Sequence, residues 1–537
     1  MDSLARPTPA KPQPSATPRS AALVGAGILG SRLSGLVRER VFAHFFGASA
    51  AADAFKAAFR IPNLLQNLFG EGVLSASFIP VYTTLLAKED EEEAKRTAGA
   101  VLALLSIVTA VLVLFGVLAA PWLINVIAPG FGGAKRVLTI HLVRILFPGA
   151  GLLVFSAWCL GVLNSHRRFF LSYIAPVAWN GAMIATLIAF GGRHGQFPLA
   201  VILAWGSVAG SALQVLVQLP AVRKLVRGMR LSLDHESQHV REALRNFVPV
   251  FFSRGVVQIS GYVDGILASL LPTGAVAALA YAQMLYMLPI SLFGMSVSAA
   301  ELPEMSGTVG EREAVLQALR RRLNAGLRQI TFFVLPSSVA LLLLGNVIVS
   351  AVYESGRFGR ADVIYVWGTV AGAALGLLAS ALGRLYSSTY YALRDTRNPL
   401  KYASVRVALT TVLGIGAAFW LPARLGYGPR WGVVGLTASA AVAAWVEFTL
   451  LRRGLRGRLG TTGVPAGFLA QLSAMALVAA VAALAVARLL ARHGPWVVAV
   501  PALGSFGAIY FGAAAALRLP ELAALRRVLR PNQRGMK

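Results

Sequence analysis

The first apolar segment of the chain contains arginine side chains, which can supply fixed positive charge inside a polar cavity. The stretch GSRLSGLVRERVF, residues 30–42, includes Arg32 and Arg38 and is flanked by apolar sequence on both sides. A charge deep within an apolar helix is costly and is normally found facing a polar interior. We therefore predict that Arg32 and Arg38 line an internal cavity. The alternatives are a structural pair between Arg32 and Glu39, or extension of Arg38 to the membrane surface.

Further charged residues follow in the second apolar segment. It opens with Asp53 and continues through Arg60 to the sequence IPNLLQNLFGEG, which contains Glu71. Pro62 can kink a helix here and free backbone carbonyls toward a cavity. Asp53, Arg60 and Glu71 are therefore candidate binding or gating residues. Asp53 is equally well explained as an acid that stabilises the start of its own helix, and Glu71 as part of a structural pair.

The chain from residue 246 onward adds three candidates, Arg254, Asp264 and Arg384. Asp264 lies well inside the apolar stretch QISGYVDGILASLL and is the predicted acidic partner of the arginines in the first segment. Arg254 and Arg384 are candidate cavity cations. For Arg384 the alternative is a purely structural contact between helices.

The composition is that of a membrane protein. The 537-residue chain is 56% apolar and only 13% charged, with a mean hydropathy of +0.66, whereas about a quarter of the residues in a soluble protein are charged. The net charge of +28 would suit a nucleic-acid partner. The basic residues fall instead in short loops between apolar blocks, which is the positive-inside pattern of membrane proteins. We therefore expect no nucleic-acid partner.

The apolar blocks predict an all-α polytopic membrane protein with about fourteen transmembrane helices and both termini in the cytosol. The predicted parts, in chain order, are a disordered cytosolic tail (1–19), an N-lobe of six spans (20–222), a basic cytosolic linker (223–245), a C-lobe of six spans (246–455), spans 13 and 14 (464–517) and a basic cytosolic tail (518–537).

An internal repeat supports the division into two lobes. The segment from Gly130–Phe131 to LNSHRRFFLSYIAP (163–176) is matched about 227 residues later by the segment from GRF (356–358) to YYALRDTRNPLKYA (390–403). In each segment an outer loop, a span, a basic inner turn and the next span follow one another. A separation of six spans makes the repeat parallel, and the seam between such lobes is where a substrate usually binds.

The sequence lacks the motifs expected of an enzyme. It contains no Walker A sequence, no nucleophile elbow and no reactive thiol site, and its single cysteine, Cys159, lies in an apolar segment. GAGILG (25–30) matches a dinucleotide-binding motif but lies in a predicted membrane helix, where small residues favour close helix packing. We therefore expect no catalysis, no ATP hydrolysis, no cofactor and no metal.

A long motif resembles one known family. The sequence SRLSGLVRERVFAHFFGASAAADAFKAAFRIPNLLQNLFGEGVLSASFIPVY (31–82) is similar to the first two helices of the MurJ/MviN family, the lipid II flippases of the multidrug/oligosaccharidyl-lipid/polysaccharide exporter superfamily. The similarity continues through LNSHRRFF, YESGRF and YALRDTRNPLK. The resemblance implies fourteen helices in two lobes that carry a lipid-linked peptidoglycan precursor, undecaprenyl-diphosphate disaccharide-pentapeptide, outward across the bacterial cytoplasmic membrane by alternating access.

The resemblance also assigns a role to the arginines. The family's substrate carries a diphosphate and carboxylates, which arginine binds through charge-assisted and often bidentate hydrogen bonds. Arg32 and Arg38 match two arginines that are important in the family, and Asp53 matches an important acid. At two further positions where the family usually has arginine, this chain has Gln66 and Gln283.

Glutamine can donate a hydrogen bond to a phosphate oxygen, but without charge. We expect Arg60, Arg254 or Arg384 to compensate for the two missing cations. The predicted function is that of a lipid II flippase, which is a carrier surrounded by membrane lipids and not an enzyme. The alternatives are an exporter of another polyprenyl-linked glycan, and a non-transporting scaffold that recruits cell-wall synthesis proteins.

The sequence leaves the driving force open. The titratable acids Asp53, Glu71 and Asp264 would permit coupling to protons or sodium ions. The membrane potential acting on a charged substrate would need none of them.

Overall fold

The structure is a computed structural model that describes residues 18–69, 71–233, 237–306 and 312–522. Within these ranges the chain is built of helices and turns, with one isolated β-bridge between Ser355 and Phe358. This confirms the predicted all-α class. The predicted tails fall largely outside the described residues.

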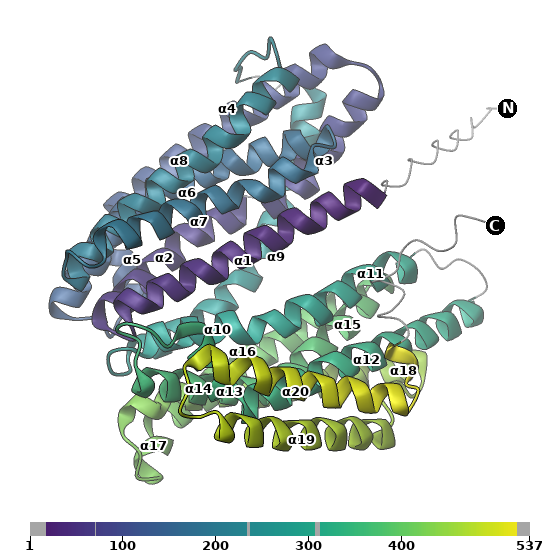
Figure 1. The fold of residues 1–537 in the computed structure, drawn as a ribbon. Coiled ribbons are helices and arrows are strands. Elements are labelled where there is room, and N and C mark those ends of the chain that lie inside the picture. The colour runs from purple at the N-terminus through teal and green to yellow at the C-terminus, as the bar shows by residue number, and fades with distance from the viewer. Residues whose placement is uncertain (1–17, 70, 234–236, 307–311, 523–537) are drawn as a thin grey trace.

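The helices form two bundles, which Figure 1 shows one above the other. The first bundle contains α1 (Pro18–Phe46), α2 (Ala50–Phe69), α3 (Glu71–Ala87), α4 (Glu91–Leu118), α5 (Ala120–Ile127), α6 (Gly133–Ser165), α7 (Phe169–Phe190) and α8 (Gln196–Leu225). The bundle packs through large apolar faces, with α6 at its centre against α2, α4 and α8. Asp90 caps α4, because its carboxylate accepts a hydrogen bond from the amide of Glu93 at 3.2 Å.

The second bundle begins with α9 (Gln238–Ser269), which also packs against α3 of the first bundle. It continues with α10 (Ala275–Pro289), the π-helix η1 (Ile290–Met295), α11 (Ser296–Ser306), α12 (Arg312–Leu343), α13 (Gly345–Tyr353), α14 (Arg360–Ala374), α15 (Leu377–Ala392), α16 (Arg397–Phe419), α17 (Leu421–Arg424), the 3₁₀-helix η2 (Pro429–Trp431), α18 (Gly432–Leu459), α19 (Ala466–Leu489) and α20 (Pro495–Ala516). The helices α19 and α20 pack on each other and on α12 and α13 (Figure 1).

Ten helices of the described chain are long and apolar enough to cross a membrane, or eleven if the bent pair α14 and α15 is one span. The predicted fourteen would add α1, the pair α2 and α3, and α9. These three segments carry the charged residues that drew attention in the sequence. The number fourteen therefore stays a prediction. The helix of the seventh predicted span begins at Gln238, within the predicted linker.

The internal repeat is visible in the backbone. Arg167, between α6 and α7, and Arg394, between α15 and α16, are 227 residues apart and both adopt left-handed backbone angles, with φ of 59° and 58°. The following amides donate to equivalent carbonyls five residues earlier: Arg168 to Leu163 at 2.8 Å, and Asp395 to Tyr390 at 2.9 Å. Both helices thus end in the same Schellman-type turn. The two bundles repeat one another in parallel, as the sequence predicted.

The predicted orientation can be tested with single cysteines in a Cys159→Ser background. The turn of Arg394 and the turn of His493, between α19 and α20, are both exposed and should lie on opposite sides of the membrane. A membrane-impermeant maleimide should label His493→Cys in intact cells and Arg394→Cys only after permeabilisation. The reverse pattern would show that the positive-inside reading of the loops is wrong.

Candidate functional site

The two bundles are joined at one end by contacts between turns. Arg40 of α1 donates to the carbonyls of Ala351 and Val352 at the end of α13, the latter at 2.9 Å. The amide of Arg357 donates to the carbonyl of His44 at 2.8 Å, and the hydroxyl of Tyr281 donates to the carbonyl of Gly47 at 3.0 Å. We call this contact region the seal.

The seal contains a tight backbone approach at Gly274, just before α10. Its φ is +96°, and a Cβ atom at this position would lie 2.6 Å from the carbonyl oxygen of Ala48. A side chain would therefore both strain the backbone and push the α1–α2 turn away. This glycine allows the two bundles to close on each other.

Asp53 of α2 is the most extensively bonded residue of the seal. It is 1% exposed, and its two oxygens accept hydrogen bonds from the amides of Gly274 at 2.7 Å and Ala277 at 2.8 Å. Lys135 of α6 forms an ion pair with it at 2.6 Å. Asp53 therefore caps the N-terminus of α10 from the opposite bundle. In this conformation its carboxylate is fully engaged and does not face a cavity.

Arg38 is held by partners in its own bundle. Its guanidinium donates to Asn180 at 3.0 Å and to Glu39 at 2.8 Å, and it lies over the ring of Trp179 at 4.7 Å. Lys56 forms the second ion pair of Glu39. The alternative of an Arg32–Glu39 pair is thus wrong, because Glu39 pairs with Arg38 and Lys56. Arg38 is a partly buried cation held by two hydrogen bonds and an aromatic ring.

Arg32 is less constrained. Its side chain is exposed, and its guanidinium approaches Ser291 of η1 at 3.5 Å, at the limit of a hydrogen bond. Figure 1 shows α1 on the face of the first bundle that is turned toward α10 and α11 of the second. Ser291 lies in the π-helical turn that follows Pro289, and such turns are frequent at functional sites. Arg32 thus lies between the bundles at a distance from the seal.

Arg60 and Asp264 lie together at the contact between α2 and α9. The hydroxyl of Tyr262 donates to the carbonyl of Arg60 at 2.7 Å. A Cβ atom on Gly265 would lie 1.4 Å from the Arg60 guanidinium, so a side chain there would have to displace the end of this arginine. Arg60 and Arg406 are the cations that interact electrostatically with Asp264. The predicted pairing of Asp264 with the first-segment arginines is therefore wrong, since Arg32 and Arg38 have other neighbours.

The charges around Asp264 extend into the second bundle. Arg406 of α16 pairs with Glu447 of α18 at 2.9 Å, and both interact electrostatically with the exposed Arg384 of α15. Sequence reasoning missed Arg406 and Glu447, as it missed Lys135 and Trp179. For Arg406, Glu447 and Trp179 the position within an apolar segment was the available signal, and Lys135 had none. No spacing links residues that meet only across helices.

Of the four remaining predicted site residues, the structure describes the side chains of two. Gln283 of α10 is exposed and Gln66 of α2 is partly buried. Glu71 and Arg254 lie in α3 and α9, and their side chains belong to the part of the molecule that is not described. No group of three or more metal-ligating side chains occurs in the described part of the chain.

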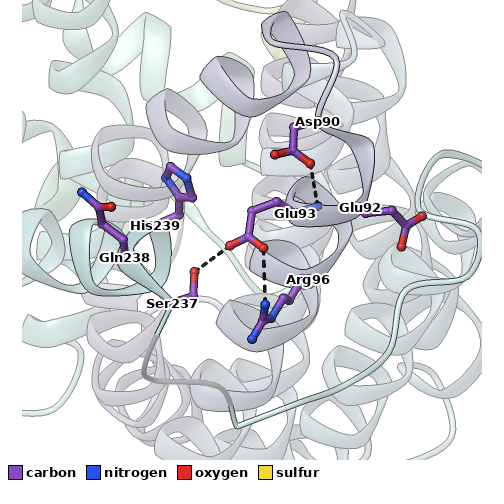
Figure 2. Close-up of a pocket in the computed structure, with 7 residues that line it drawn as sticks. All are labelled: Asp90, Glu92, Glu93, Arg96, Ser237, Gln238 and His239. Atoms are coloured by element: carbon purple, nitrogen blue, oxygen red, sulfur yellow. Dashed lines mark hydrogen bonds and ion pairs between the residues drawn. The ribbon is translucent and has the colours of Figure 1, made fainter.

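A hollow of about 550 Å³ near the start of α4 is acidic rather than cationic. Figure 2 shows Ser237, just before α9, donating to Glu93 at 2.7 Å, with Arg96 paired to the same carboxylate at 3.7 Å. This contact ties the start of α9 to α4. It fixes the connection between the bundles and is poorly suited to an anionic ligand.

Two helical bundles that meet at one end form a fold that solved transporter structures share. An inward-facing multidrug resistance MATE family transporter of the MOP superfamily matches 79% of this chain and 95% of its own, with a TM-score of 0.61 and 17% identity. A lipid II flippase MurJ in an inward closed conformation matches 92% of this chain and 99% of its own, with a TM-score of 0.71 and 23% identity.

The sequence identifies the family within this fold. The family model described as lipid II flippase MurJ matches residues 42–507. A probable lipid II flippase MurJ of Rhizobium tropici is 32% identical over 441 residues, covering 80% of each chain. The lipid II flippase MurJ of Burkholderia cenocepacia is 32% identical over 434 residues, covering 80% of this chain and 81% of the relative. The chain belongs to the MurJ family of multi-pass bacterial membrane proteins.

The role of Asp53 in the seal predicts an effect on amide exchange. Asp53→Asn removes the charge opposite Lys135 and weakens the acceptors of Gly274 and Ala277, and a hydrogen bond to a charged group contributes about 1.5–3 kcal/mol. Hydrogen exchange at residues 274–278 should therefore accelerate by about tenfold or more. Glu447→Gln, which removes an acid distant in the chain from the seal, should leave these amides unchanged. Unaltered exchange in Asp53→Asn would contradict the role of this cap.

Proposed function

We propose that this chain is a flippase that moves lipid II from the inner to the outer leaflet of the cytoplasmic membrane for cell-wall synthesis. Its family supports this function. The observation that carries the proposal is the contrast between the two ends of the bundle contact. The seal is closed by Asp53, Lys135 and Arg40, while Arg32 remains exposed between the bundles. That contrast is expected of a carrier open toward the inner side.

The chemistry of lipid II suits these cations. Its diphosphate is a compact anion, which Arg32 can bind with its fork of donors, and Arg38 is fixed six residues further along α1 by Trp179 and Asn180. A rigid second cation reduces the side-chain entropy lost on binding. Each group acts by binding and orientation, so the proposed activity is transport without catalysis.

Outward opening would require the seal to separate. The amides of Gly274 and Ala277 would have to exchange Asp53 for water or new partners, and the Arg40 contacts would have to break. The Lys135–Asp53 ion pair lies within the first bundle and need not break. Substrate binding between the bundles would supply the differential interaction that shifts this equilibrium. We place both termini in the cytosol, so the seal lies on the outer side.

Two glutamines at positions where the family usually has arginine make another polyprenyl-linked glycan the second candidate substrate. Gln66 and Gln283 replace two cations expected for the family, and Gln283 is exposed on α10. We expect Arg384 of α15 to compensate for the two missing cations, because its side chain is exposed. Arg60 is less suited, since it is held in the contact of α2 with Gly265.

The function is tested in bacteria depleted of their own flippase by measuring lipid II exposed on the outer surface. Expression of this chain should restore exposure, and Arg32→Ala at equal membrane abundance should reduce it by about tenfold or more, since a charge-assisted contact contributes about 1.5–3 kcal/mol. Restoration by both proteins would exclude a binding role for Arg32.

The outcome also distinguishes the alternative functions. Exposure of a different lipid-linked glycan without lipid II would establish the second candidate substrate. Recovery of growth without any lipid-linked exposure would establish a scaffold that recruits wall-synthesis proteins.

Compensation by Arg384 is tested in the same assay. Arg384→Gln should reduce lipid II exposure at unchanged abundance, whereas Arg397→Gln should not, because Arg397 lies at the exposed start of α16 outside the bundle contact. Equal activity of the two variants would remove Arg384 from the proposed site.

A further inference from the structure

A basic cavity lies on the first bundle, at the turn between α6 and α7 and the end of α8. It has a volume of about 690 Å³ and is lined by the cations Arg167, Arg168 and Lys224 together with apolar side chains of α7 and α8. None of its lining residues is an acid. The cavity therefore combines a cationic rim with an apolar wall.

The turn between α6 and α7 holds two of these cations in place. The amide of Arg167 donates to the carbonyl of Asn164 at 3.0 Å, and the amide of Arg168 donates to Leu163 at 2.8 Å. Both arginine side chains are exposed. Within the described residues, neither arginine nor Lys224 takes part in an ion pair. Glu91, the acid that interacts with neighbouring His166, is paired with Lys95 at 3.2 Å.

The equivalent turn of the second bundle shows that this charge is not required by the backbone. The position equivalent to Arg168 is Asp395, which accepts from the amide of Asn398 at 3.1 Å and pairs with Arg458 at 3.0 Å. The hydrogen bond from the Asn398 amide, together with Arg458, holds the pKa of Asp395 below its ordinary value. The position after the left-handed residue is thus an acid paired with an arginine in the second bundle and an exposed arginine in the first.

The apolar wall continues along the outer surface of α8. Phe170 is 44% exposed and Val217 is 39% exposed beside the cations. Leu213 lies one helical turn from Val217 and Leu216 adjoins it, and both are also exposed. In a membrane protein such a surface faces acyl chains. A ligand that fits this cavity needs an anionic group at the level of the turn and hydrocarbon along α8.

We propose that this cavity binds an anionic diacyl phospholipid of the inner leaflet, with its phosphate between Arg167, Arg168 and Lys224 and one acyl chain along Phe170, Val217 and Leu213. This rests on the proposed membrane orientation. The site is separate from the Arg32 region, because it is lined only by the turn between α6 and α7 and by α7 and α8. Basic pockets between helices on the cytosolic side attract anionic headgroups through charge in just this setting.

The test measures lipid binding to the full-length protein in neutral detergent micelles. The first probe is dioleoyl-phosphatidylglycerol, an intact anionic lipid. The second is dioleoyl-phosphatidylcholine, which has the same acyl chains without the net charge. The third is glycerol phosphate, which has the anionic group without acyl chains. The variant is Arg167→Gln/Arg168→Gln/Lys224→Gln. The matched control is Arg394→Gln/Arg397→Gln/Arg453→Gln, which removes the same charge from exposed positions on the second bundle.

The wild-type protein and the control should bind phosphatidylglycerol equally, and the cavity variant should bind it about 10- to 100-fold more weakly. Phosphatidylcholine should bind weakly to all three proteins, and glycerol phosphate should not compete. Equal binding by the two triple variants would overturn the proposal, as would competition by glycerol phosphate or equal binding of phosphatidylcholine.

A further variant separates this site from the transport site. Arg32→Gln should retain phosphatidylglycerol binding, and its loss in that variant would place the lipid between the bundles and refute the proposed cavity. Because binding in micelles requires no transport, a chain that fails to flip lipid II would still give a definite result here.

Discussion

A carboxylate of one bundle that caps a helix of the other is the interaction on which this conformation depends. Asp53 is buried at the start of α2, yet the amides that it satisfies belong to α10. If the bundles separate here, two amides lose a charged acceptor together, whereas Lys135 belongs to the same bundle as Asp53 and keeps it. The seal is therefore cooperative, because its members are satisfied or unsatisfied as a group. Gly274 makes the geometry possible by leaving room for the carbonyl of Ala48.

Three arginines of α1 have different environments, which depend on their distance from the seal. Arg40 belongs to the seal, Arg38 is fixed within its own bundle by Trp179 and Glu39, and Arg32 remains open between the bundles. A helix that carries cations at three depths is costly in a membrane unless each has a defined environment. For Arg40 and Arg38 that environment is protein, and for Arg32 it is the proposed substrate path.

The sequence was a good guide to periodic features and a poor guide to pairings. Apolar blocks and repeated turns in the sequence indicate the helices, the two bundles and the 227-residue repeat. The left-handed backbone angles of Arg167 and Arg394 recur at that spacing. The sequence marked Asp53 as important, but its partners are backbone amides more than 200 residues away, which no side-chain pattern encodes. Asp264 was given the wrong partners because Arg60 and Arg406 reach it only through helix packing.

The central claim is that the seal controls which side of the membrane reaches the Arg32 region. Ser291 reports on this directly, because it contacts Arg32 in the described conformation. Ser291→Cys in a Cys159→Ser background should be labelled by an impermeant maleimide from the cytosolic side only, and adding Asp53→Asn should produce labelling from the outside. Equal outside labelling with and without Asp53 would show that this carboxylate does not hold the outer side closed.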